Sequence, residues 1–229
     1  MLKAQKKISK KEIKEDKLVT TYFEARTWME RNTRLVTIIV LVPVALIVLL
    51  VAWNWKRSQA NEAATTRLAK IMPYYDDGRY DLAINGVPQE GTHGLQSIVD
   101  EYGSTKAGGV ASLYLANAYY ASGQYDRALQ AYKGVDVSDR MLTASAYAGI
   151  GACYEAKHAP ADAAPWFEKA AAKDMELTMA PDNLQRAAAN YAAAGDKPKA
   201  VELLKTLKKE FPTSPNAREA DRYIAEFAS

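Results

Sequence analysis

An uninterrupted apolar run occupies residues 35–55, with the sequence LVTIIVLVPVALIVLLVAWNW and no charged side chain. A helix of this length extends about 31 Å at ~1.5 Å per residue, which matches the hydrocarbon core of a bilayer. A cleaved signal peptide would have a shorter apolar stretch and a small-residue cleavage site, whereas 34 residues precede this run. The pattern therefore predicts a transmembrane helix over 35–55 that stays in the protein.

Helix-forming residues continue beyond the apolar run, because no glycine or proline occurs between positions 56 and 72. Ala64 and Leu68 recur on one side of such a helix. We therefore expect a helical connection over 56–63 that leads into the first helix of the following domain. That helix is expected to end near Met72 and Pro73.

The chain beyond residue 108 repeats one pattern three times, over 109–143, 144–180 and 181–214. In each copy an apolar residue precedes a small residue, and a tyrosine, an alanine and another bulky residue follow at similar spacings. The equivalent residues are Leu115, Ala116, Tyr119, Ala128 and Tyr132 in the first copy, Ile150, Gly151, Tyr154, Ala163 and Phe167 in the second, and Ala187, Ala188, Tyr191, Ala200 and Leu204 in the third. Three copies in register predict pairs of helices that stack in sequence order.

The spacing of the repeated residues has a physical reason. Small residues such as Gly151 let the first helix of a copy approach the second closely, and tyrosines such as Tyr154 fill the seam. Each copy buries its apolar side only against a neighbour, which predicts a scaffold without a pocket. The expected fold class is all-α, with an N-terminal transmembrane helix followed by a solenoid of helical hairpins.

A divergent fourth copy is expected nearest the apolar run, over residues 64–108. Tyr74 and Gly78 keep the tyrosine and the turn of the pattern. Residues 85–92, with the sequence NGVPQEGT, interrupt the second helix, which is expected to resume at His93. The repeat domain then extends from residue 64 to residue 229.

The last segment, 215–229, is predicted to form a capping helix. Its apolar residues lie on one side, and its charged residues lie on the other, as the end of a stack requires. The apolar residues are Ala217, Ala220, Ile224 and Phe227.

Positive charge is concentrated in residues 1–34, which hold ten of the 30 basic and five of the 27 acidic side chains. The rest of the chain is therefore slightly acidic. A nucleic-acid binder would spread positive charge over its folded part, so we expect no nucleic-acid partner.

The basic tail at 1–34 also has a helical pattern. Ser9 and Glu12 have the spacing of a capping box. The residues that recur on one helical face are Leu18, Tyr22, Ala25 and Met29. Three interpretations of this amphipathic tail stay open: an interfacial helix at the bilayer, a contact for a partner protein, and a solvated anchor that only sets the topology.

The orientation of the apolar run is predicted from the flanking charges. Three arginines within 15 residues before the run nearly balance four basic residues after it. The lysines before Leu18 favour a cytosolic tail, since short tails carry the orienting charge and long domains translocate largely regardless of charge. We therefore expect the N-terminus inside and the repeat domain outside, which in a bacterium with two membranes means an inner-membrane protein with a periplasmic repeat domain.

The segment from Ala64 to Ser229 resembles the tetratricopeptide repeat superfamily. The whole layout, with its stretch GLQSIVDEYGSTKAGGVASLYLANAYYASGQYDRAL, resembles the ancillary Sec-translocon subunit family (YfgM-like). This resemblance implies an adaptor or chaperone-like role with protein partners: translocon subunits, periplasmic chaperones or translocating polypeptides. The alternative is a structural assembly subunit of another inner-membrane complex, because repeats specify a fold and not a partner.

The sequence has no pattern typical of catalysis. Cys153 is the single cysteine, and His93 and His158 lie far apart without other ligands at metal-binding spacing. The stretch AGIGACYE has no following strand and no third glycine at the spacing of a nucleotide-binding loop. We therefore expect no enzymatic activity, metal, cofactor or small-molecule substrate.

A groove for a protein partner is expected on the first helices of the repeats. Its candidate residues are Met72, Tyr75, Leu113, Asn117, Tyr120 and Glu155. Asn117 alone occupies a position at which repeats that clamp a C-terminal carboxylate place their polar side chains. The aromatic and apolar character of the set favours contact with a helix or an unfolded apolar segment. The alternative is that these side chains pack under the NGVPQEGT insertion.

Overall fold

The computed structural model describes residues 10–135, 139–173 and 179–228, so the predicted capping box at Ser9 and Glu12 lies outside the described side chains. The chain divides into two compact units, Met1–Lys56 and Arg57–Ser229.

The first unit contains α1 (Lys10–Arg31) and the beginning of α2 (Thr33–Asp76). Apart from the half-buried Val36, the large apolar side chains of residues 35–55 are exposed, and Leu49 has 65% of its surface accessible. By length and composition, α2 is long and apolar enough to cross a membrane. An exposed apolar surface of this size is unfavourable in water.

Helix α2 continues without interruption through residues 56–63, where a helical connection was expected. It passes Met72 and Pro73 and ends at Asp76, so the predicted end was wrong by about one turn. Pro73 lacks an N–H donor but does not end the helix. The helix ends in a turn in which the N–H groups of Gly78 and Arg79 donate to the carbonyls of Tyr75 and Tyr74.

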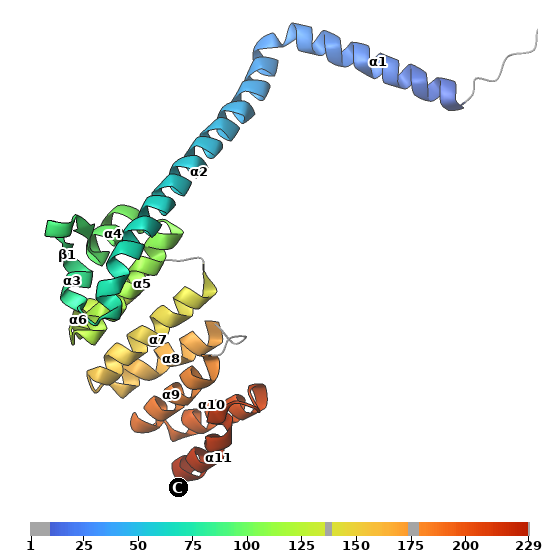
Figure 1. The fold of residues 1–229 in the computed structure, drawn as a ribbon. Coiled ribbons are helices and arrows are strands. Elements are labelled where there is room, and N and C mark those ends of the chain that lie inside the picture. The colour runs from blue at the N-terminus through green and yellow to red at the C-terminus, as the bar shows by residue number, and fades with distance from the viewer. Residues whose placement is uncertain (1–9, 136–138, 174–178, 229) are drawn as a thin grey trace, which may run out of the picture. The chain divides into compact units, whose positions relative to one another are not determined.

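The second unit is a stack of helical pairs, which can be followed in Figure 1 from α2 to α11. Successive helices from α4 to α11 are in contact with one another. The helices that follow α2 are α3 (Tyr80–Asn85), α4 (Leu95–Tyr102), α5 (Lys106–Ala121), α6 (Tyr125–Lys133), α7 (Arg140–Ala156), α8 (Pro160–Lys173), α9 (Ala180–Ala193), α10 (Lys197–Glu210) and α11 (Pro215–Ala228).

The insertion in the divergent copy forms a small hairpin. Strand β1 (Gly86–Val87) pairs antiparallel with β2 (Thr92–His93), and the 3-10 helix η1 (Pro88–Glu90) lies between them. Since His93 is paired in β2, α4 begins at Leu95 and not at His93 as expected. In the part of the chain that the structure describes, the helical fold therefore carries one two-stranded element.

Four helices, α2, α5, α7 and α9, end in the same hydrogen-bonded turn. In α5 the Gly123 N–H donates to the Tyr120 carbonyl, and the following N–H donates to the Tyr119 carbonyl, which is the Schellman pattern. The residues at the position of Gly123 are Gly78, His158 and Gly195, and all four have positive φ angles. The equivalence of these turns relates the divergent copy to the other three.

Close packing inside the stack depends on glycines of α7. A Cβ atom at Gly151 would lie 2.8 Å from the Phe167 ring, and one at Gly149 would lie 2.3 Å from the Tyr132 ring. Phe167 is fully buried. The small residue at position 151 therefore lets α7 and α8 approach closely, as the repeat spacing indicated.

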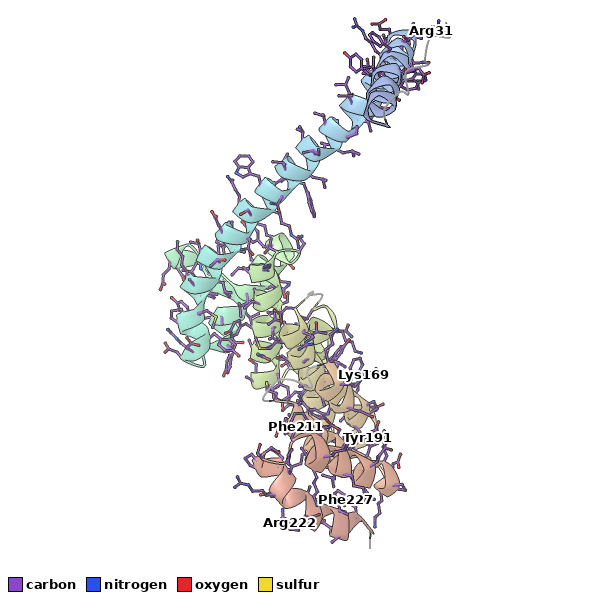
Figure 2. All side chains as sticks on the ribbon, turned by 90° about the vertical axis from the view of Figure 1, so that its right-hand side faces the viewer. Arg31, Lys169, Tyr191, Phe211, Arg222 and Phe227 are labelled. Carbon is purple, nitrogen blue, oxygen red and sulfur yellow. The ribbon has the colours of Figure 1, made fainter. Side chains whose placement is uncertain are left out.

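The last helices close the stack, with the aromatic side chains Tyr191, Phe211 and Phe227 labelled in Figure 2. Ala217 and Ala220 of α11 are buried against α9 and α10, and Phe227 is partly buried beside them. The charged residues of α11, such as Arg222, remain exposed.

Candidate functional site

The six predicted groove residues lie on three helices, each of which is the first of its repeat. Met72 and Tyr75 belong to α2, Glu155 belongs to α7, and the other three belong to α5. All six side chains are half-buried. We refer to this set, Met72, Tyr75, Leu113, Asn117, Tyr120 and Glu155, as the predicted surface.

Tyr75 is the centre of an aromatic group in the predicted surface. Its ring centroid lies 5.0 Å from that of Tyr114 and 5.5 Å from that of Tyr80, in edge-to-face geometry. Burial raises the pKa of the Tyr75 hydroxyl, whereas its hydrogen bond with Asn117 opposes that rise. This hydroxyl is therefore neutral at physiological pH.

Asn117 connects Tyr75 with the second helix of its own repeat. The Tyr132 hydroxyl donates to Asn117 Oδ1 at 2.5 Å. Burial raises the pKa of Tyr132 well above its ordinary range. Asn117 is thus held between two tyrosines, and its amide positions α2, α5 and α6 relative to one another.

Glu155 connects two repeats of the stack. Its carboxylate accepts hydrogen bonds from the Arg186 guanidinium and from the Asn190 amide, both on α9. The Arg186 guanidinium also lies 4.1 Å from the centroid of the Phe167 ring. Glu155, which was predicted as a groove residue, therefore also makes a contact between repeats. The sequence did not predict this contact.

Tyr120 is the aromatic residue of the predicted surface nearest to Glu155 and Arg186. Burial is the main cause that raises the pKa of Tyr120. The Tyr125 hydroxyl raises this pKa further, and the ring centroids of the two tyrosines lie 5.4 Å apart. Beyond Tyr120, the equivalent positions on α7 and α9 hold the small residues Ala148, Ala152 and Ala189, and Ala189 is exposed. The first helices thus present tyrosines on α2 and α5 and alanines on α7 and α9.

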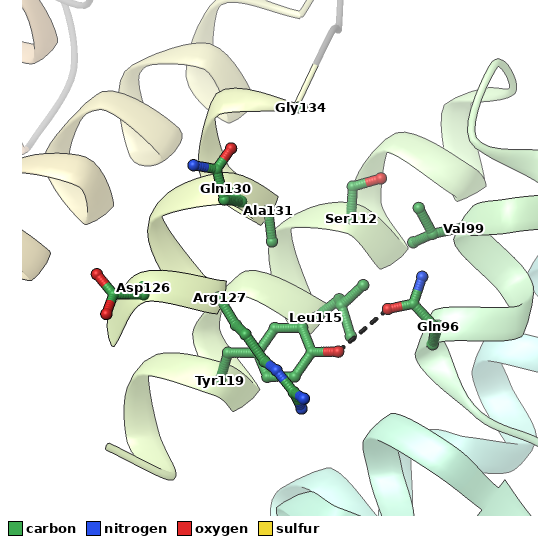
Figure 3. A pocket seen from close by; sticks show the side chains of 10 residues that line it. All are labelled: Gln96, Val99, Ser112, Leu115, Tyr119, Asp126, Arg127, Gln130, Ala131 and Gly134. Atoms are coloured by element: carbon green, nitrogen blue, oxygen red, sulfur yellow. Dashed lines mark hydrogen bonds between the residues drawn. The ribbon is translucent and has the colours of Figure 1, made fainter. Parts of the chain in front are cut away.

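A separate cavity of about 520 Å³ opens among α4, α5 and α6, as Figure 3 shows. Leu115 and Tyr119 of α5 line it together with Gln96 of α4 and Arg127 of α6. The Tyr119 hydroxyl donates to Gln96 Oε1 at 3.1 Å, and the Arg127 guanidinium lies 5.8 Å from the Tyr119 ring centroid. The expectation of a stack without a pocket was therefore wrong.

Two of the helices that line the cavity are short: α4 has 8 residues and α6 has 9. The sequence did not predict this cavity. Gln96 follows the insertion, and Tyr119 was assigned only to the seam between the two helices of its repeat. Two of the polar side chains that line it are paired within the chain: Gln96 Nε2 donates to Asp100 Oδ1, and Ser112 Oγ donates to the Gly108 carbonyl, both at 2.9 Å.

The chemistry of Cys153 is that of a core residue. The thiol is fully buried in the cluster shared by the first repeats, and burial raises its pKa to about 11. It is therefore protonated at neutral pH and a poor nucleophile. Among the described residues, no three His, Cys, Asp or Glu side chains are grouped as a metal site would require.

Comparisons with known proteins agree with this architecture. A family model described as a tetratricopeptide repeat-like domain matches residues 26–150, which is more than half of the chain. A model of the tetratricopeptide repeat matches residues 182–214. Among curated proteins, none matches the chain.

Two solved structures with a similar fold come from Podosopora anserina. They are crystal structures of nearly identical tetratricopeptide-like repeats of a putative kinesin light chain, one of them a variant. Each shares 17% sequence identity with this chain and has a TM-score of 0.55. Each match covers 73% of this chain, and the matches cover 85% and 86% of the two solved chains. At this identity, the likeness shows the fold alone.

Proposed function

The chain belongs to the family of proteins with a tetratricopeptide repeat-like domain, and from this premise we propose that it is a membrane-anchored scaffold that binds other proteins. Repeats of this kind form surfaces for protein–protein interaction. The observation that carries the proposal is α2, whose exposed apolar run at 35–55 continues as one helix into the first repeat. A bilayer would remove that apolar run from water.

Within this function, the chain serves as an ancillary, chaperone-like adaptor of the Sec translocon. The tail is cytosolic and the repeats are periplasmic in a bacterial inner membrane. Support comes from the layout of basic tail, single apolar run and small repeat domain, which resembles that subunit family. A single span is too simple to form a channel, so the repeats act on partners of the channel or on polypeptides leaving it.

The side chains of the first helices support contact with apolar segments of varied sequence. Tyr120 offers a large ring with a neutral hydroxyl, and Ala148, Ala152 and Ala189 leave the neighbouring surface small and uncharged. Such a surface demands no particular partner sequence. The paired carboxylate of Glu155 adds no free charge at its edge.

Site-specific photo-crosslinking in cells tests the proposed function. A benzoyl-phenylalanine probe replaces Tyr120 or Leu113 in the predicted surface, and a third variant carries it at the exposed Ala189. The control probe replaces Arg222, whose side chain is 69% exposed on α11 (Figure 2). We expect the surface probes to capture translocating polypeptides, chaperones or translocon subunits, and the control probe to capture far less.

Other outcomes would contradict specific parts of the proposal. Capture of one stable subunit of an unrelated complex would replace the adaptor with an assembly platform. Equal capture at Arg222 and Tyr120 would remove the predicted surface as the binding site.

A further inference from the structure

The cavity among α4, α5 and α6 has an apolar floor and apolar walls (Figure 3). Leu115 and Tyr119 of α5 are buried and form the floor. Val99 of α4 and Ala131 of α6 line it from the neighbouring helices, and both are half-buried. A volume of about 520 Å³ lies within the range of sites that bind ligands. The cavity therefore has room for a large apolar side chain of another molecule.

Two charged side chains line the cavity, and they differ in their pairing. The Asp126 carboxylate forms an ion pair with Lys157 Nζ of α7 at 2.5 Å. Arg127 is exposed, and its Nη1 donates to the amide oxygen of Gln124 at 3.0 Å. No carboxylate of the described residues pairs with the Arg127 guanidinium. Its positive charge therefore remains available at the edge of the cavity.

The guanidinium of Arg127 lies close to the apolar floor. Its central carbon is 5.8 Å from the centroid of the Tyr119 ring, and the Tyr119 hydroxyl donates to Gln96 Oε1 at 3.1 Å. Because Nη1 is directed to Gln124, Nε and Nη2 remain as donors for an oxygen of a ligand. One ligand can therefore reach the positive charge and the apolar floor at the same time.

The spacing of these two features indicates the chemistry of the ligand. Residues one turn apart on a helix have Cβ atoms about 5 to 6 Å apart, which matches the 5.8 Å between the guanidinium and the Tyr119 ring. A carboxylate on such a helix would form charge-assisted hydrogen bonds with Arg127, and an apolar side chain one turn away would enter the cavity. A basic segment would be repelled by the same guanidinium.

We propose that this cavity is a second protein-binding site, which takes a helical segment of a partner polypeptide. The segment carries a side chain of the size of leucine or phenylalanine one turn from an aspartate or a glutamate. The apolar side chain packs on Leu115 and Tyr119, and the carboxylate pairs with Arg127. The cavity shares no residue with the predicted surface, so the inference depends neither on that surface nor on the membrane anchor.

Binding of designed peptides to the purified full chain in detergent tests the inference. The probe is a fluorescent peptide of about 15 residues, built on alanine and glutamine so that it is helical, with a leucine and a glutamate one turn apart. One comparison peptide has glutamine in place of the glutamate, and another has alanine in place of the leucine. We expect each comparison peptide to bind at least about five-fold more weakly than the probe. Equal binding of the three peptides, or no binding by any of them, would overturn the inference.

Two variants of Arg127 test which group meets the carboxylate. Arg127→Gln should bind the glutamate and glutamine peptides alike, and Arg127→Glu should prefer a peptide with lysine in place of the glutamate. The matched control is Lys133→Gln, because Lys133 is exposed on the same helix and does not line the cavity. This control should keep the preference for glutamate, and thermal midpoints check that each variant folds. A preference for glutamate that persists in Arg127→Gln would overturn the proposed site.

A photo-reactive peptide locates the bound segment. Benzoyl-phenylalanine replaces the leucine of the probe, and the labelled residues are identified by mass spectrometry. Labels at Val99 or Ala131 would support the cavity as the site. Labels at Tyr120, or on α7 and α9, would overturn it, because the peptide would then lie on the first helices. Since these measurements use the purified chain alone, their failure would leave the cross-linking of Tyr120 to partners in cells unaffected.

Discussion

Among the described residues, His158 is the one non-glycine residue with a positive φ angle. Three of the four equivalent helix-ending turns place glycine at this position, whereas His158 adopts a φ of 56° with a Cβ atom present. A side chain in this left-handed conformation costs about 1 to 2 kcal/mol relative to the ordinary one. The turn forms nevertheless, because its two hydrogen bonds to the carbonyls of Glu155 and Tyr154 are retained.

Replacement of this histidine by glycine should therefore stabilise the protein. We expect His158→Gly to raise the free energy of unfolding by about 0.5 to 1 kcal/mol, because relief of the φ strain exceeds the added freedom of the unfolded chain. The measurement is the denaturation midpoint of the purified full chain. The matched control, Gly123→Ala, has free space around its new Cβ and should lower the midpoint through backbone strain alone.

The buried thiol of Cys153 predicts a loss of stability at alkaline pH. The folded chain raises its pKa from 9.0 to about 11, so the folded state holds the proton more tightly than the unfolded state. The contribution of the protonated thiol to the free energy of unfolding is complete below pH 9 and is lost as the pH rises toward 11.

The thermal midpoint should consequently fall more steeply between pH 8.5 and pH 10.5 in the native chain than in Cys153→Ala, which lacks the titrating group. Parallel decreases in the two proteins would show that Cys153 titrates alike in both states.

At the scale of helices, the contact between α7 and α8 depends on a single missing methyl group. Gly151→Ala would bring a Cβ atom to 2.8 Å from the buried Phe167 ring, closer than real Cβ contacts. Overpacking of this kind costs about 1 to 3 kcal/mol. We expect a lower denaturation midpoint for Gly151→Ala. If the clash is the cause, Phe167→Leu in the same chain should return part of that loss.

The helices beyond residue 108 could be predicted because their periodic small residues and tyrosines are local signals of helix pairing. The close approach of α7 and α8 at Gly151 followed from the repeat spacing, whereas the packing of Gly151 against the Phe167 ring did not. The hairpin at 86–93 could not be predicted, since residues of this insertion match no repeat and pair over only two positions. The end of α2 was also missed, because Pro73 was given more weight than the turn at Gly78.

The candidate site was predicted only as positions on helices. Periodicity places Tyr75, Asn117 and Glu155 on first helices, but it does not reveal their partners. Glu155 pairs with Arg186 and Asn190, which lie 31 and 35 residues further along the chain. Such pairs depend on side-chain directions in the next repeat, and these are fixed only when the helices pack. The cavity beside Tyr119 was missed for the same reason.

At the scale of the whole molecule, the distribution of charge along the chain predicts its topology. Residues 1–34 carry ten basic and five acidic side chains, and the apolar run follows immediately. Because short basic tails resist translocation and long domains do not, we expect the tail in the cytosol and the repeats in the periplasm.

Reporter fusions decide between the two orientations, because alkaline phosphatase is active only after export and a fluorescent protein that folds in the cytosol gives the opposite signal. Fused after Ser229, the phosphatase should be active and the fluorescent protein dark. The matched fusions at the N-terminus should give the reverse, since the tail carries the orienting lysines.

A fluorescent fusion after Ser229 together with an inactive phosphatase would place the repeats in the cytosol. The partners of the first helices would then have to be sought among cytosolic proteins, and the adaptor role for emerging polypeptides would be wrong, whereas the repeat fold would be unaffected.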